Sequence, residues 1–165
     1  MSGDELQLGN ECSAWQDVQD GLVRWAGERG FLAELPQVRT GRAWLREVLP
    51  PLCPLRDDCV TVLSELLANC AEHGGGGQVS VVVTHVWGRV TGMLVHHAAP
   101  TARVRVPVPG SGEVGAIEQL EESGRGLVVV TELCGGEVEI EQKADRTVIR
   151  WRLHGSCACE ESDEY

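Results

Sequence analysis

Glu65 and Asn69 are the residues whose types and spacing most directly suggest chemistry. They stand four apart in the run CVTVLSELLANCAEHG, residues 59–74, and a helix would hold both side chains on one face. A carboxylate can orient or accept a proton, and a carboxamide oxygen is a suitable ligand for Mg²⁺. The pair therefore predicts a site that orients a phosphate group and its metal ion for transfer.

The helix that must position this pair is predicted over residues 59–74. Its apolar positions recur at helical spacing and predict the side that packs in the core: Cys59, Leu63, Leu66, Leu67 and Cys70. The glycines at 74–77 follow the C-terminal end of this helix, which presents carbonyl groups, whereas a phosphate needs N–H groups. We interpret these glycines as a helix cap and turn, and not as a phosphate-binding loop.

An amphipathic helix is predicted over residues 13–30, ahead of a short strand at 31–35. Ser13 and Gln16 form a capping box, and Gly30 ends the pattern. The apolar stripe consists of Trp15, Val18, Leu22, Trp25 and Ala26. We expect this stripe to pack in the core, and the alternative is a dimer or partner surface that exposes Trp15 and Trp25.

The rest of the chain divides into one more helix pattern, a hairpin, a long connection, a helix and two strands. These segments are residues 36–49, 79–96, 100–122, 127–134, 137–141 and 147–153, and residues 123–126 lead into the helix at 127–134. Pro36 suits a first helical turn, and Pro50 stops that helix. The order predicts an α+β fold, a two-layer sandwich of a mixed, mainly antiparallel sheet with helices on one face.

Composition narrows the function classes. The 165 residues suit a single domain, and the net charge of −11 opposes direct binding to nucleic acid or to an anionic membrane. No apolar run approaches the roughly 20 residues of a membrane span. The N-terminus is polar and acidic, unlike a signal peptide, so a cytoplasmic protein is expected.

The cysteines do not predict a disulfide framework or a metal site. Their number, seven, is odd, and reduced thiols are expected in the absence of a secretory signal. Cys157 and Cys159, with His154, lack a second cluster that would complete a set of four ligands. Residues 155–165 are predicted to be a disordered acidic tail, and residues 1–12 a disordered N-terminus.

Motif order then points to a family. ELLANCAEHG, a hairpin, HAAP and a loop that ends in ESGRGL follow one another over most of residues 36–153, and Arg42 lies in the preceding helix. This arrangement resembles the anti-sigma-factor serine kinases, a small bacterial branch of the GHKL ATPases with the Bergerat fold. The resemblance implies a GHKL-like ATP-binding domain over residues 31–154.

The resemblance also implies roles for individual residues. Glu65 would act as the general base or position the attacking group, and Asn69 would bind both the nucleotide and the Mg²⁺ ion that bridges the phosphates of ATP. Gly124 and Gly126 match the glycines that cradle phosphate with backbone N–H groups at the start of a helix. Arg125, between them, would contact a phosphate or a partner, with a surface salt bridge as the alternative.

His97 departs from the family pattern. The family has an aspartate three residues before a proline, where it accepts a hydrogen bond from the adenine amino group, and here His97 precedes Pro100 by that spacing. A neutral imidazole can accept one hydrogen bond, but it lacks the charge of a carboxylate. Loss of the charge-assisted hydrogen bond would weaken binding by roughly 1.5–3 kcal/mol. His96 is the alternative occupant if the strand register differs by one residue.

Two function classes follow from this pattern. In the first, the chain is an anti-sigma-factor-like regulator that binds a sigma factor and phosphorylates a serine of an anti-sigma-factor antagonist with Mg-ATP, in a partner-switching scheme. In the second, it is a nucleotide-independent binding module of the same fold that acts by sequestration. A homodimer is implied by the resemblance, with Trp15, Trp25 and Trp44 as candidate apolar surface. A sensor histidine kinase is disfavoured because too few residues precede Pro36 to form its dimerisation helices.

Overall fold

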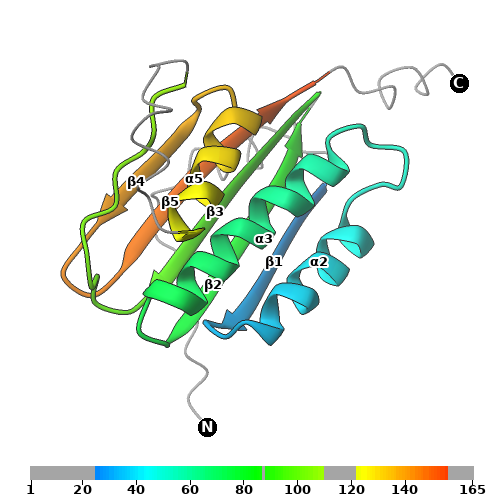
Figure 1. Cartoon of the computed structure of the whole chain (residues 1–165). Coiled ribbons are helices and arrows are strands. Elements are labelled where there is room, and N and C mark those ends of the chain that lie inside the picture. The colour runs from blue at the N-terminus through cyan, green and yellow to red at the C-terminus, as the bar shows by residue number, and fades with distance from the viewer. Residues whose placement is uncertain (1–24, 87, 110–121, 156–165) are drawn as a thin grey trace, which may run out of the picture.

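In the computed structural model, which describes residues 25–86, 88–109 and 122–155, three helices lie against one face of a five-stranded sheet (Figure 1). The elements in chain order are β1 Trp25–Leu32, α2 Pro36–Val48, α3 Arg56–His73, β2 Gln78–Val86, β3 Arg89–His97, α5 Glu122–Leu133, β4 Val138–Gln142 and β5 Thr147–His154. The predicted α+β sandwich with helices on one face is confirmed.

The sheet has the strand order β1-β2-β3-β5-β4. All pairings between the described strands are antiparallel, so the expectation of a mixed sheet was wrong. The hairpin of β2 and β3 turns at Gly88, which has a φ of 67°. The strand β5 returns beside β3 and leaves β4 at the edge, so the last two strands also form an antiparallel pair.

The predicted N-terminal helix was wrong over its last residues. Residues 25–30 belong to β1, in which Trp25 pairs with His85 of β2, and residues 13–24 lie outside the described residues. Gly27 and Gly30 weaken a helix, and the backbone groups of this segment bond instead to β2. The short strand expected at 31–35 is the end of β1, which stops at Leu32.

Helix boundaries follow the local chemistry of the sequence. Pro36 occupies the first turn of α2, and α3 has Asp57 and Asp58 in its first turn, where the helix dipole favours negative charge. Gly74 ends α3, and the next three glycines have φ values of 69°, 84° and 93°, which L side chains rarely adopt. The predicted cap and turn at 74–77 are confirmed.

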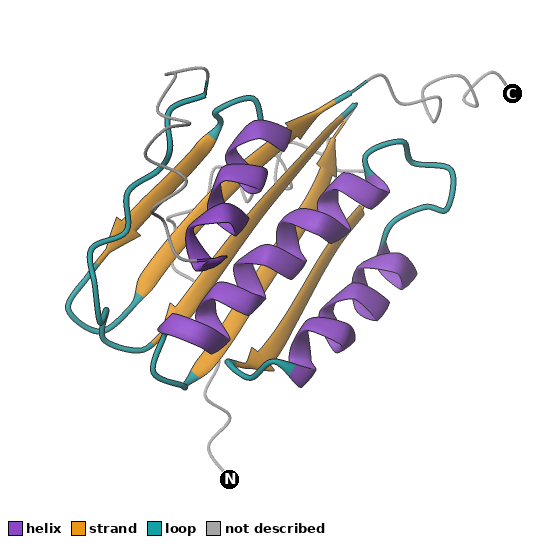
Figure 2. Ribbon diagram, viewed as in Figure 1, coloured by secondary structure: helices purple, strands orange, loops and turns teal. Residues whose placement is uncertain are grey.

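The main hydrophobic core fills the space between the helices and the sheet. It includes Leu45 of α2, Leu63 and Leu66 of α3, and Trp151 of β5, each at most 1% exposed. A smaller cluster lies among strand residues of the opposite alternation, Val82, Met93, Val95 and Val148. Figure 2 shows the described helices on one face only, so this cluster belongs to the other face, called the outer face below.

None of the helices in the described part of the chain is long and apolar enough to cross a membrane.

Candidate functional site

Helix α3 presents Glu65 and Asn69 as half-buried side chains at the edge of its buried face. Their neighbours Ser64, Leu66, Leu67 and Cys70 are buried. This packing against the core fixes the rotation of α3 about its own axis. The pair is therefore held in one orientation by residues that take no part in chemistry themselves.

The start of α5 lies directly against this pair. A methyl group added at Gly126 would overlap Glu65 Oε2 and would lie 3.6 Å from Asn69 Oδ1. Only a residue without a side chain allows α5 to come this close to the two oxygens. The structure thus brings Gly126, which is distant in the sequence, against the neighbouring residues Glu65 and Asn69.

Gly124 and Arg125 lie in the same first turn as Gly126. The motif was expected to precede the helix, whereas α5 begins at Glu122 and includes the glycines. The two glycines still lie near the N-terminus of the helix, where the N–H groups of the first turn lack acceptors within the helix and favour an anion. The Arg125 side chain is exposed.

Arg42 of α2 contacts α3 one residue before Glu65. Its Nε donates a hydrogen bond of 2.8 Å to Ser64 Oγ, and Ser64 Oγ donates one of 2.6 Å to the carbonyl of Val60. The sequence pattern drew attention to Arg42 but missed Ser64. The signal that could have found it is a hydroxyl on the buried stripe beside Glu65, which needs a polar partner.

His97 does not face the Glu65–Asn69 pair. Its Nε2 lies 3.1 Å from Ser80 Oγ of β2. Successive strand residues point to opposite faces, so His97 shares the outer face with Val95 and Met93. The predicted adenine contact at this position is therefore turned away from the side of the sheet that carries α3 and α5.

The environment of His97 disfavours a charged imidazole. Burial lowers the pKa of this side chain below its ordinary value of 6.5, and the positive charges of Arg146 and His96 lower it further, against an opposing effect of Asp145. The ring is therefore neutral at pH 7. A neutral imidazole hydrogen-bonded to a serine hydroxyl is a structural arrangement that needs no ligand.

His96, the register alternative, lies on the helix face of β3. Its ring is 6% exposed and packs against Gly74 at the end of α3. Its Nε2–H donates a hydrogen bond of 2.6 Å to the carbonyl of Gly76. Of the two histidines, His96 is therefore the one on the helix side of the sheet, where Gly74 and Gly76 enclose its ring.

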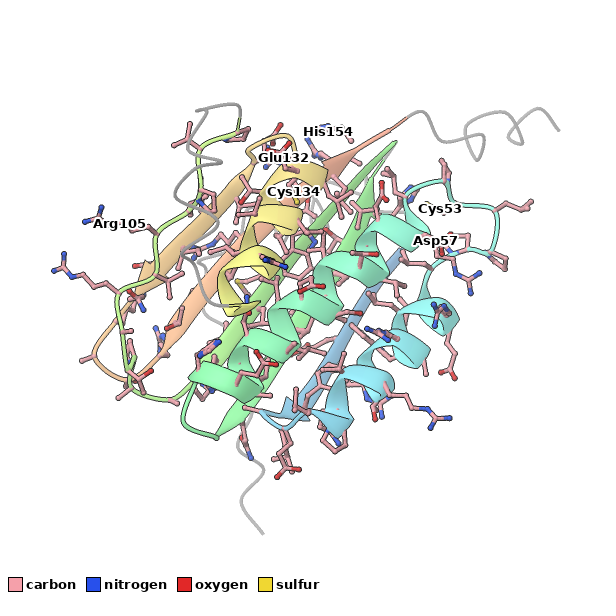
Figure 3. All side chains as sticks on the ribbon, in the orientation of Figure 1. Cys53, Asp57, Arg105, Glu132, Cys134 and His154 are labelled. Carbon is pink, nitrogen blue, oxygen red and sulfur yellow. The ribbon has the colours of Figure 1, made fainter. Side chains whose placement is uncertain are left out.

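The segment after β3 is fastened to the same end of α3. Thr101 Oγ1 donates a hydrogen bond of 2.6 Å to the carbonyl of His73. Further along, Gln142 of β4 donates to the carbonyl of Ala102 and accepts from the N–H of Val104. Arg105 extends from this segment away from the helices (Figure 3) and is exposed.

The residues that were expected to bind phosphate suit a Mg²⁺ ion, whereas the residue that was expected to bind adenine does not lie beside them. Asn69 offers a carboxamide oxygen beside a helix N-terminus, and Mg²⁺ needs few protein ligands because it keeps several waters. His97, by contrast, faces the other side of the sheet. A separate hollow of ≈ 330 Å³ is lined by residues of β3 and β5 and by residues 136–139, and it shares no residue with the Glu65 site.

Fold and site together define an ATP-binding domain of the GHKL type: an antiparallel sheet under helices, with a Glu–Asn pair beside a glycine at a helix N-terminus. The chain belongs to the histidine kinase-like ATPase domain family, whose pattern matches residues 31–153. The chain matches none of the curated proteins. The predicted GHKL-type ATP-binding domain is confirmed at the level of this family.

Proposed function

We propose that the protein is a cytoplasmic anti-sigma-factor-like regulator that phosphorylates a serine of an antagonist protein with Mg-ATP and binds a sigma factor, as a homodimer. Glu65 orients or deprotonates the attacking hydroxyl, and Asn69 binds Mg²⁺. Mg-ATP, when bound, would supply the phosphoryl group together with a metal charge that favours its transfer. Phosphoryl transfer depends mainly on such positioning and charge neutralisation.

The contact of Gly126 with Glu65 and Asn69 supports this proposal most strongly. A carboxylate and a carboxamide oxygen face the first turn of α5 at close range. A polyphosphate bound at that turn would accept hydrogen bonds from its free N–H groups and share a metal ion with Asn69. The anti-sigma specificity is supported by the order of the motifs along the chain.

The test is transfer of labelled phosphate from ATP to candidate antagonists by the purified protein. Glu65→Gln should lower the transfer rate by about 100-fold or more, as expected when a general base is removed, while ATP still binds. Glu132→Gln is the matched control, because Glu132 is exposed and lies at the opposite end of α5 (Figure 3). A wild-type protein that is folded but neither binds ATP nor transfers phosphate would exclude kinase activity.

The position of His97 favours a second candidate, a nucleotide-independent binding module of the same fold. The expected adenine-binding position is turned to the outer face, and His96 is already hydrogen-bonded to Gly76. In this case partner binding survives without ATP, and Glu65→Gln leaves it intact. Measuring partner affinity with and without Mg-ATP separates the two candidates.

A further inference from the structure

Part of the outer face of the sheet is buried, although no described helix covers it (Figure 2). The residues at its centre are between 1% and 9% exposed: Ser80, Val82, Thr84, Thr91, Met93, Val95 and Val148. Val82 pairs with Met93, and Val95 pairs with Val148, so the apolar members form one continuous cluster. An antiparallel sheet with a solvated face would carry polar side chains at these positions.

We propose that residues 13–24 of the same chain cover this cluster, with Trp15, Val18 and Leu22 packed against Val82, Met93, Val95 and Val148. These three apolar residues recur at i, i+3 and i+7, the spacing of one helix face. Gln16, Asp17 and Asp20 then face water. The outer face is in this way closed to partners, which must dock on the helix side or at a sheet edge.

The place where this segment joins the fold allows it to reach the cluster. It joins β1 at Trp25, and Trp25 pairs with His85 on the strand that carries Val82. From β1 across β2 and β3 to β5 is about 14 Å, three strand spacings. Residues 13–24 as a helix span about 18 Å, which is enough to cross these strands.

The other segments outside the described residues suit this role less well. Residues 110–121 rejoin the fold at α5, which lies on the helix face. Residues 156–165, SCACEESDEY, are acidic and have no apolar stripe at helical spacing. A second copy of the chain remains a distinct occupant that the test must separate.

Oxidation of Met93 provides the test, because the chain has two methionines and the other is Met1. The full-length protein is treated with dilute hydrogen peroxide, and oxidation of each methionine is followed by peptide mass spectrometry. Met93 should oxidise more slowly than Met1, and Leu22→Glu should speed its oxidation by about tenfold or more, because the thioether becomes accessible. Gln16→Glu adds the same charge on the polar side and should change the rate by less than about twofold.

Three results would overturn the proposal. Met93 oxidises as fast as Met1 in the wild-type protein; Leu22→Glu and Gln16→Glu behave alike; or protection of Met93 disappears on dilution together with a dimer measured by light scattering. The last result assigns the face to a second copy.

A second measurement remains informative if Leu22→Glu fails to fold. A benzophenone amino acid at position 22 of the full-length protein should, on illumination, form an intramolecular cross-link to peptides that contain Val82, Met93 or Val148. Cross-links confined to helix peptides, or found only in a species of twice the mass, would contradict the proposal.

Discussion

At the scale of single residues, the absence of a side chain at Gly126 allows α5 to approach Glu65. Gly126→Ala places a methyl group on Glu65 Oε2 and close to Asn69 Oδ1. We expect the affinity for ATP or the transfer rate to fall by about tenfold or more. A loss of about 1.4 kcal/mol in the corresponding free energy is enough for a factor of ten. Helix propensity favours alanine over glycine by about 1 kcal/mol, which offsets the cost of displacing the Glu65 side chain. The free energy of unfolding should therefore change little.

The control for this substitution is Gly30→Ala. A methyl group at Gly30 would meet no atom closer than Val79 O, at 4.0 Å. Its activity should match the wild type. Isothermal titration of the two variants gives the affinity for ATP, and urea unfolding gives the free energy of unfolding. An unchanged ATP affinity in Gly126→Ala would show that nucleotide does not bind between α3 and α5.

His97 predicts a pH dependence of stability. Its pKa in the folded protein is lowered by burial, Arg146 and His96, so the unfolded chain binds a proton at this position at a higher pH than the folded protein does. The unfolded state is therefore favoured as pH falls below 6.5, and the stability present above that pH is progressively lost. His97→Gln removes this contribution.

Urea unfolding at about pH 7.5 and about pH 5.5 measures the effect as a difference between variants. The loss of unfolding free energy on acidification should be smaller in His97→Gln than in the wild type. Groups far from position 97 contribute equally to both proteins and cancel in this comparison. An equal or larger loss in the variant would contradict the assigned direction of the pKa.

The side chains of the site were predictable to different degrees. The spacing of Glu65 and Asn69 is local, and it set their common face correctly. The faces of His96 and His97 could not be predicted, because a shift of one residue in strand register exchanges them. Pairing of Val79 with His96 fixes that register, and it is a contact between strands.

At the scale of elements, the pairing of β3 with β5 depends on Gly92. Trp151 stands opposite Gly92, and its ring occupies the place of a side chain there. Trp151 is 1% exposed and cannot move aside without disturbing the core. Gly92→Ala should therefore lower the free energy of unfolding by about 2–3 kcal/mol through overpacking.

A double-mutant cycle with Trp151→Leu checks this mechanism by urea unfolding. Trp151→Leu alone leaves a cavity and should cost about 3 kcal/mol, but it also makes room for a methyl group at position 92. The double variant should then lose clearly less than the sum of the two single losses. Strict additivity would show that the alanine acts elsewhere.

The elements predicted from sequence were those with strong local signals. Helix α3, the hairpin of β2 and β3, and the stop of α2 before Pro50 were predicted, and the largest error in their bounds is the start of α3, which lies three residues before residue 59. β1 was not, because its Trp25 and Ala26 also continue a helical stripe. A partner strand, β2, far along the chain decides its conformation, and periodicity within one segment carries no information about such a partner.

At the scale of the whole molecule, net charge makes Mg²⁺ important. The chain carries a net charge of −11, which repels a polyphosphate, so we expect ATP to bind better when a metal ion neutralises part of its charge. A ligand that binds only the folded protein stabilises it by about 2.7 kcal/mol at a hundredfold excess over its Kd. For a domain of this size, this free energy raises Tm by about 5–10 °C.

Thermal unfolding with ATP, in Mg²⁺ or in EDTA, tests this dependence. We expect the wild type to gain most of its stabilisation only when Mg²⁺ is present, because in the proposed function the carboxamide oxygen of Asn69, which lies near Gly126, binds the metal ion. Asn69→Ala should retain the small effect of metal-free ATP and lose the Mg²⁺-dependent part, whereas Glu132→Gln should behave as the wild type. If millimolar Mg-ATP leaves the Tm of the wild type unchanged, the fold has kept its Glu–Asn pair without its nucleotide, and the binding-module function is the better account.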